Sequence, residues 1–150
     1  MGAGYSKMCP KCGFEFESLE GIGFLFPLVY KETVEDAKRG KLGDKIKEFF
    51  QEHEDGAINA ERVTLCCDKC GCLSMDKDLT MYIPTEDGVP FEDLEYLTKN
   101  DLDMYYEEYA KYEHRCDECG GTMRILDKNE DMLCPECKIP MVEEQIICWD

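Results

Sequence analysis

The chain has 150 residues, 43% of them hydrophobic, and its formal net charge is −17. This length accommodates one modest domain or two small ones. The sequence contains no run of about eighteen apolar residues, which argues against a membrane-spanning helix. The strong negative charge disfavours direct binding to the phosphates of nucleic acids.

The stretch 5–16 predicts a short β-hairpin that carries the first of four C-x-x-C cysteine pairs. Phe14 and Phe16 alternate with glutamates, which is the period of a strand. Cys9 and Cys12 form the first pair, in the sequence C-P-K-C-G.

An apolar run at 21–30 is followed by a helical insert at about 31–56. Pro27 interrupts the apolar run, where we expect a buried strand and turn; an exposed docking patch is the alternative. Thr33 is the expected cap of a first helix that ends near Gly40, and a second helix is expected to begin at about Gly43 or Asp44. The second helix has an apolar stripe at positions i, i+3, i+4 and i+7. The stripe consists of Ile46, Phe49, Phe50 and His53.

A strand expected at 62–65 leads into a crowded cysteine segment, C-C-D-K-C-G-C. Three choices of ligand pair are possible in it. The pair Cys67 and Cys70 retains the C-x-x-C-G form seen elsewhere in the chain, so we prefer it. Cys66 and Cys72 are then spare thiols, which in proteins are usually small buried apolar side chains.

The turn-rich segment 85–90 marks the expected boundary between an N-terminal module, 1–84, and a C-terminal part, 85–150. Beyond it, the acidic region 91–113 predicts a helix from about Asp101. One side of this helix would carry Leu102, Tyr105, Tyr106, Tyr109 and Tyr112. We expect this side to face the core; a tyrosine-rich interaction surface is the alternative.

The part 113–150 holds two cysteine pairs separated by fourteen residues. The two pairs are Cys116 with Cys119 and Cys134 with Cys137. Strands are expected at 122–126 and 141–148, and with a short strand near Met132 they would form one small sheet. Cys148 is expected to be buried in the last strand.

Four cysteine thiolates that converge on one point are the ligand set of a tetrahedral ion such as Zn²⁺. Two cysteines three positions apart can direct both sulfurs at one ion if the backbone turns tightly, and a glycine after the second cysteine permits the turn. Gly13, Gly71 and Gly120 occupy this place in three pairs, whereas Lys138 occupies it in the fourth. The four pairs therefore predict metal binding.

Two other uses of cysteine compete with metal binding. A disulfide framework is typical of secreted proteins, but the 11 cysteines are odd in number and the first residues contain no apolar signal segment. A thioredoxin-like redox pair would be expected near a βαβ pattern rather than in four copies. We expect neither histidine to be a ligand. His53, at the end of the apolar stripe, is expected to be half-buried and to pack like an aromatic residue. His114 precedes Cys116 by two positions and is expected to lie near the site or to be exposed, because four cysteines already suffice there.

The C-P-x-C-G pairs resemble the knuckles of the zinc-ribbon and rubredoxin-like superfamily, most closely over 113–150. The resemblance implies that two knuckles face each other across one ion on a small antiparallel sheet. We therefore expect a small α+β fold with two four-cysteine zinc-ribbon-like sites on short β-hairpins, with helical inserts. The first site would comprise Cys9, Cys12, Cys67 and Cys70 and close across the helical insert. The second site would comprise Cys116, Cys119, Cys134 and Cys137.

The expected function is that of a cytoplasmic protein-interaction or regulatory module with two structural zinc ions per chain. A site closed by four cysteines leaves no position for a reacting water, and no nucleophile or phosphate-loop motif occurs, so we expect no enzymatic activity. The acidic charge favours a basic protein partner over nucleic acid. A rubredoxin-like protein that transfers electrons through an iron ion bound by four cysteines is the alternative. Transcription-linked work through a basic protein partner is a third possibility.

Overall fold

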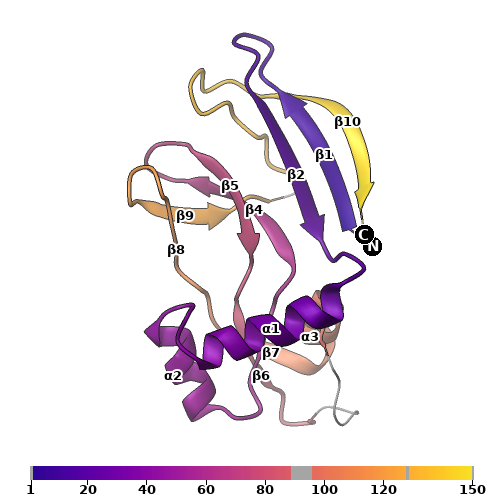
Figure 1. The fold of residues 1–150 in the computed structure, drawn as a ribbon, viewed down its shortest axis with the longest axis vertical. Helices are drawn as coiled ribbons and strands as arrows, with labels where there is room; N and C mark the ends of the chain where they lie inside the picture. The colour runs from indigo at the N-terminus through magenta and orange to yellow at the C-terminus, as the bar shows by residue number, and fades with distance from the viewer. Residues whose placement is uncertain (1, 89–95, 128, 150) are drawn as a thin grey trace. The chain divides into compact units, whose positions relative to one another are not determined.

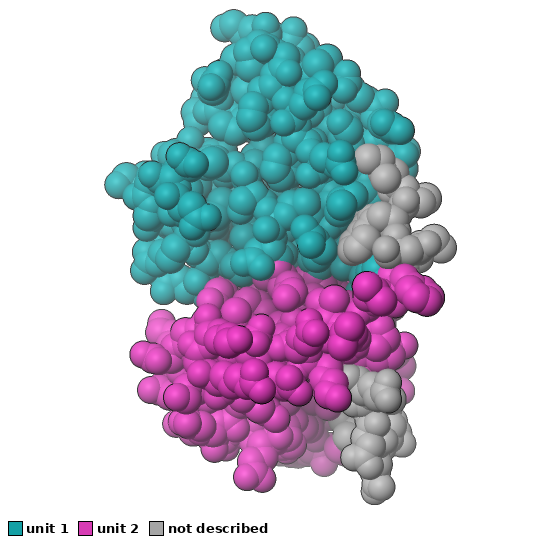
Figure 2. Space-filling model, viewed as in Figure 1, with its two compact units in different colours: residues 1–23, 62–76, 113–150 teal, residues 24–61, 77–112 magenta. Residues whose placement is uncertain are grey.

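The structure is a computed structural model that describes residues 2–88, 96–127 and 129–149, and its elements are drawn in Figure 1. The chain divides into two compact units, which Figure 2 shows in different colours. Unit 1 comprises 1–23, 62–76 and 113–150, and unit 2 comprises 24–61 and 77–112.

Unit 1 is built on a seven-stranded sheet with the strand order β10-β1-β2-β4-β9-β8, in which β5 also pairs with β4. The first and last strands pair antiparallel, with Gly2 opposite Trp149 and Met8 opposite Val142. β1 and β2 form the expected N-terminal hairpin. The strands are β1 (Gly2–Met8), β2 (Glu15–Gly21), β4 (Arg62–Cys67), β5 (Leu73–Lys77), β8 (His114–Arg115), β9 (Thr122–Ile125) and β10 (Val142–Trp149).

Both units combine segments from the two halves of the chain, so their bounds differ from the expected modules 1–84 and 85–150. The reason is strand pairing, because β1 pairs with β10 and β4 pairs with β9. The strands expected at 122–126 and 141–148 do lie in one sheet, but it is not a small separate C-terminal sheet, because β1, β2 and β4 stand between β10 and β9. The side chain of Cys148 lies outside the described part of the chain.

Among the described residues, the core of unit 1 includes two small clusters. One cluster contains Cys9, Leu73, Met132, Cys134 and Met141, and the other contains Leu65, Cys67, Cys116 and Met123. A polar network links the strands beside them. The carboxylate of Glu20 accepts hydrogen bonds from the hydroxyls of Thr64 (2.7 Å) and Tyr5 (2.9 Å), and the Ser18 hydroxyl lies 2.5 Å from that of Thr64.

Unit 2 contains helices and a small antiparallel sheet with the strand order β3-β6-β7. Its elements are α1 (Phe26–Lys38), α2 (Asp44–Glu52), β3 (Ala57–Ile58), β6 (Met81–Pro84), α3 (Lys99–Tyr105) and β7 (Tyr106–Ala110). No helix among the described residues is both long and apolar enough to cross a membrane. The small α+β fold with antiparallel sheets is as expected.

Helix α1 begins earlier than expected, at Phe26. Pro27 stands in its first turn, where a backbone amide has no helical partner and its loss costs little. The strand and turn expected at 21–30 are therefore wrong for the second half of that run. Thr33 is not the cap; it is buried inside the helix, and its hydroxyl donates to the Val29 carbonyl at 2.6 Å.

Helix α2 forms where the apolar stripe of the sequence predicts a helix. It begins at Asp44, and the stripe residues Ile46, Phe49 and Phe50 are buried. His53 follows the helix, and its ring centroid lies 5.3 Å from that of Phe49. The expected aromatic packing of this histidine is confirmed.

The acidic region does not form one continuous helix. Helix α3 ends at Tyr105, and the next residues form β7, which pairs with β6. Pairing with a neighbouring strand thus overrides the helical pattern of the sequence. The expected single tyrosine-rich face is divided, since Leu102 is fully buried whereas Tyr109 is 48% exposed. The start of the region, 91–95, lies outside the described residues.

Candidate metal centres

The eight cysteines expected as ligands gather into two clusters, both within unit 1. In each cluster the four sulfurs all lie within 4.8 Å of one another. Site A consists of Cys9, Cys12, Cys134 and Cys137, and site B consists of Cys67, Cys70, Cys116 and Cys119.

The expected pairing of the knuckles is wrong, because the first knuckle faces the fourth and the second faces the third. Pairing of β1 with β10 brings the first knuckle to the C-terminal part of the chain, and pairing of β4 with β9 brings the middle knuckles together. The knuckles therefore follow one another along the chain in the order A, B, B, A. The first and second knuckles therefore do not form one site that closes across the helical insert.

All four knuckles share one backbone turn. In each, the residue after the second cysteine donates its amide to the carbonyl of the first cysteine, at 2.9 to 3.0 Å. That residue has a φ between 61° and 80°, a left-handed conformation that favours glycine. Three knuckles have glycine there, whereas Lys138 adopts the conformation with a φ of 61°.

The sulfur positions fit a tetrahedral ion. The distances between sulfurs of facing knuckles include 3.6 Å (Cys12–Cys134), 3.4 Å (Cys67–Cys119) and 3.6 Å (Cys70–Cys116). Four sulfurs at about 2.3 Å from a zinc ion would lie about 3.8 Å from one another. Each cluster could therefore hold a metal ion with only small shifts of its side chains.

Backbone amides point at the buried sulfurs. The Cys70 amide donates to the Cys67 sulfur, and the Cys137 amide donates to the Cys134 sulfur, both at 3.4 Å. Each acceptor is the first cysteine of its knuckle, and both are buried. Such bonds stabilise a thiolate, which is the form that binds metal.

The thiols of one site do not ionise alike. The Cys70 amide, followed by the Lys69 amide, outweighs desolvation and lowers the pKa of Cys67 to about 6. In the same site the Cys72 amide favours the Cys70 thiolate, but desolvation and the neighbouring thiols raise the pKa of Cys70 to about 12. A divalent cation offsets the repulsion between thiolates, so metal binding would displace the remaining protons.

The pKa values of the thiols in site A differ in the same way. The Cys12 amide lowers the pKa of Cys9 to about 7. Contact with the Cys12 thiol, together with desolvation, raises the pKa of Cys137 to about 12. Both sites therefore pair a cysteine that ionises readily with one that needs a cation nearby.

The spare cysteines and the histidines lie outside both clusters. Cys66 and Cys72 are half-buried, and desolvation raises the pKa of each thiol. His114 is buried, and its Nδ1 lies 3.9 Å from an Asp76 carboxylate oxygen. The choice of Cys67 and Cys70 from the crowded segment therefore agrees with the observed cluster.

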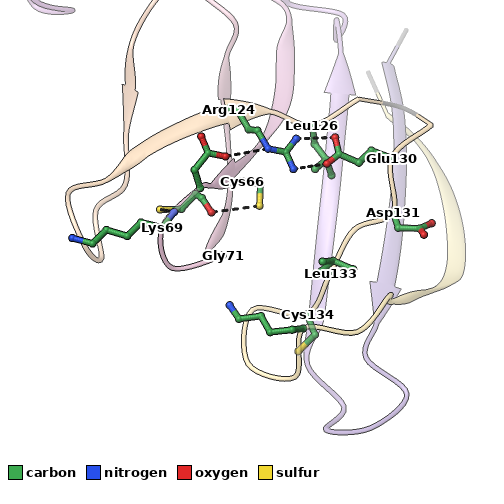
Figure 3. A pocket seen from close by; sticks show the side chains of 12 residues that line it. Cys66, Lys69, Gly71, Arg124, Leu126, Glu130, Asp131, Leu133 and Cys134 are labelled. Carbon is green, nitrogen blue, oxygen red and sulfur yellow. Dashed lines mark hydrogen bonds and ion pairs between the residues drawn. The ribbon is translucent and has the colours of Figure 1, made fainter.

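A pocket of about 330 Å³ is lined by residues from both sites, among them Cys67 and Cys134 (Figure 3). Along its wall the Arg124 guanidinium binds the Glu130 carboxylate through two nitrogens and contacts Asp68 at 3.1 Å. Acidic and basic side chains are thus paired on this wall. The pocket shows that the two sites are neighbours within unit 1.

The sequence does carry a signal for the observed pairing. Pro10 and Pro135 follow the first cysteine in the two knuckles of site A, whereas Asp68 and Asp117 follow it in the two knuckles of site B. Each site therefore combines knuckles of the same form, C-P-x-C or C-D-x-C. Grouping the knuckles by distance along the chain missed this match.

The chain matches no protein-family model, and neither a curated protein nor a solved structure is significantly similar to it. The assignment of the sites therefore rests on geometry. Two clusters of four cysteines, with knuckle spacing and a shared backbone turn, are consistent with zinc-ribbon-like metal sites.

Proposed function

We propose that this is a zinc protein in which two structural ions hold unit 1 together. The observation that carries the proposal is the closure of each cluster, in which four sulfurs lie within 4.8 Å of one another. Zinc prefers four thiolates in a tetrahedral arrangement, and a site closed by four cysteines leaves no position for a reacting water. We accordingly propose a structural rather than a catalytic role for both sites, in a reducing compartment such as the cytoplasm.

The proposed role of the whole protein is that of a protein-interaction or regulatory module with a basic partner. Support comes from the net charge of −17 and from the outer strand of the sheet in unit 2. On β7, Glu107 and Glu108 are exposed, and the neighbouring Tyr109 is 48% exposed. Exposed carboxylates attract a basic partner, and a tyrosine offers contact area at a low cost in conformational entropy.

An iron-binding, electron-transferring protein is the second candidate. The amide-to-sulfur hydrogen bonds at Cys67 and Cys134 favour it, because such bonds help to set the reduction potential of iron–thiolate centres. The same bonds stabilise zinc thiolates, so the identity of the metal is the discriminating observation.

Metal analysis with a visible spectrum, on protein produced in a metal-replete host, tests the proposal. We expect two zinc ions per chain and no colour. Iron with red thiolate-to-iron absorption would replace the proposal with electron transfer, and protein that binds neither metal would overturn both.

The partner proposal requires a separate test. We expect a lysine-rich peptide to bind the zinc-loaded protein with an affinity that falls as salt is added. Exchanging Glu107 and Glu108 for glutamine should weaken this binding, whereas exchanging Glu32 and Glu35 on α1 for glutamine is the control for the same loss of charge. Equal effects of the two double variants would mean that only net charge matters and would count against β7 as the contact surface.

A further inference from the structure

Lys138 departs from the glycine of the other three knuckles, and the structure shows what its side chain does. With a φ of 61° it adopts a conformation that costs a residue with a Cβ about 1 kcal/mol or more. Its amide makes the knuckle bond to Cys134 at 2.9 Å, so the backbone belongs to site A. The side chain, however, reaches site B.

The Lys138 ammonium donates a hydrogen bond to the Cys70 carbonyl at 2.9 Å. It lies over the turn of the second knuckle so closely that a Cβ added at Gly71 would be 2.5 Å from the lysine nitrogen. The Gly71 amide in turn donates to the Cys67 carbonyl at 3.0 Å, which is the bond that closes this knuckle. One side chain from site A therefore rests on the backbone that positions two ligands of site B.

The ammonium also brings a positive charge to the second knuckle, two of whose thiols are ligands of site B. A zinc ion with four thiolates has a net charge of about −2, which follows from the charges of its ligands. Lys138 therefore offsets charge at site B, and its position depends on the turn that the ligands Cys134 and Cys137 of site A hold in place.

We infer that Lys138 couples the two metal sites, so that loading of either site raises the metal affinity of the other. This inference rests on the proposed metal-binding function. Metal at site A fixes the turn 134–138 and so places the ammonium on the second knuckle, which lowers the cost of ordering Cys67 and Cys70 for metal. Because such coupling is reciprocal, site B raises the affinity of site A by the same factor.

The test is a double-mutant cycle on the affinity of site B. Cys9→Ser with Cys12→Ser removes site A through its N-terminal knuckle and leaves residues 134–138 unchanged. Lys138→Met removes the hydrogen bond and keeps most of the apolar stem. Zn²⁺ is titrated against a competing chelator, and the Gly13 and Gly71 amide signals in NMR spectra report the occupancy of sites A and B separately.

Each change alone should weaken zinc binding at site B about fivefold, which corresponds to about 1 kcal/mol for one hydrogen bond. The combined variant should be no weaker than either change alone, because both remove the same contact. Effects that multiply to about twenty-fivefold would overturn the inference, as would a Lys138→Met variant with the affinity of the wild type.

One further variant tests the interpretation. Lys138→Gly suits a φ of 61°, so it should fold even if the methionine variant does not, and it should weaken site B equally. Wild-type protein that binds no zinc would overturn the proposed function, whereas two zinc ions bound independently would overturn only the coupling.

Discussion

The two units of the chain bury different kinds of side chain. In unit 1, four of the nine residues in the two core clusters are cysteines of the metal sites, and the other five are leucine or methionine. Unit 2 instead buries aromatic and aliphatic side chains. These include Phe26, Tyr30, Ile46, Phe49, Phe50, Tyr82 and Leu102. We therefore expect unit 1, whose core includes four cysteines of the candidate metal sites, to need a cation for stability, whereas unit 2 can rely on apolar packing.

Removal of metal is the strongest test of this difference. A structural zinc ion contributes on the order of 10 kcal/mol to the stability of a small domain. Treatment with a strong chelator, or Cys134→Ser at site A, should therefore abolish hydrogen-exchange protection of β1 and β10. The amides of α1 and α2 should remain protected.

The matched control is Cys66→Ser, which changes a cysteine outside both clusters. It should retain two zinc ions and full protection of both units. Simultaneous loss of protection in both units on chelation would contradict the distinction between a metal-dependent and a metal-independent unit.

A cavity in the apolar core of unit 2 should have the second-largest effect. Ile46 on α2 is fully buried, and Ile46→Ala should lower the free energy of unfolding of this unit by about 2–5 kcal/mol. Zinc content should not change. Leu28→Ala on α1 is the control, because Leu28 is 53% exposed. The free energy of unfolding of both variants is measured by urea unfolding, followed by the circular dichroism of the helices. A loss of zinc in Ile46→Ala would argue against independent units.

The polar network of unit 1 predicts a smaller effect. Thr64→Val removes the hydrogen bond that the Thr64 hydroxyl donates to Glu20 and its hydrogen bond with Ser18, at a cost of about 1–3 kcal/mol. The loss should be measurable only in zinc-loaded protein, because the network is formed by strands of the metal-dependent unit. Thr64→Ser retains the hydroxyl and should restore most of the stability; if it does not, the methyl packing of Thr64 matters more than its hydrogen bonds.

The smallest predicted effect concerns alkaline pH. Desolvation raises the pKa of Tyr30 above its ordinary value of about 10. A folded-state pKa that is raised contributes stability that is present below pH 10 and is lost as the pH rises further. The urea midpoint of unit 2 should therefore fall above about pH 10, and less steeply in Tyr30→Phe. An unchanged slope in that variant would show that other tyrosines carry the dependence.

Local patterns in the sequence predicted local structure well. The hairpin of β1 and β2 follows from strand alternation, and α2 follows from its apolar stripe. The eight clustered cysteines follow from their spacing, because the turn between two cysteines involves only neighbouring residues. Each of these features depends on contacts within a few positions of the chain.

Contacts between distant segments were not predictable in the same way. Pairing with β6 makes a strand of Tyr106–Ala110 where the local pattern indicates a helix. The partners of each knuckle depend on which strands share a sheet, and spacing along the chain does not encode that choice. In the sequence, Lys138 only departs from the glycine found in the other three knuckles. Its hydrogen bond to the Cys70 carbonyl is visible only in the structure.

The A, B, B, A order of the knuckles also determines when the cysteines of each site are synthesised. Cys70 and Cys116 of site B are 46 positions apart, whereas Cys12 and Cys134 of site A are 122 positions apart. At about 5–20 residues per second, the first knuckle waits about 6–25 s for its partner. The last cysteine of site B, Cys119, is made before Cys134 and Cys137 complete site A. Site A thus joins two segments whose synthesis is far apart in time, whereas the two knuckles of site B are made closer together.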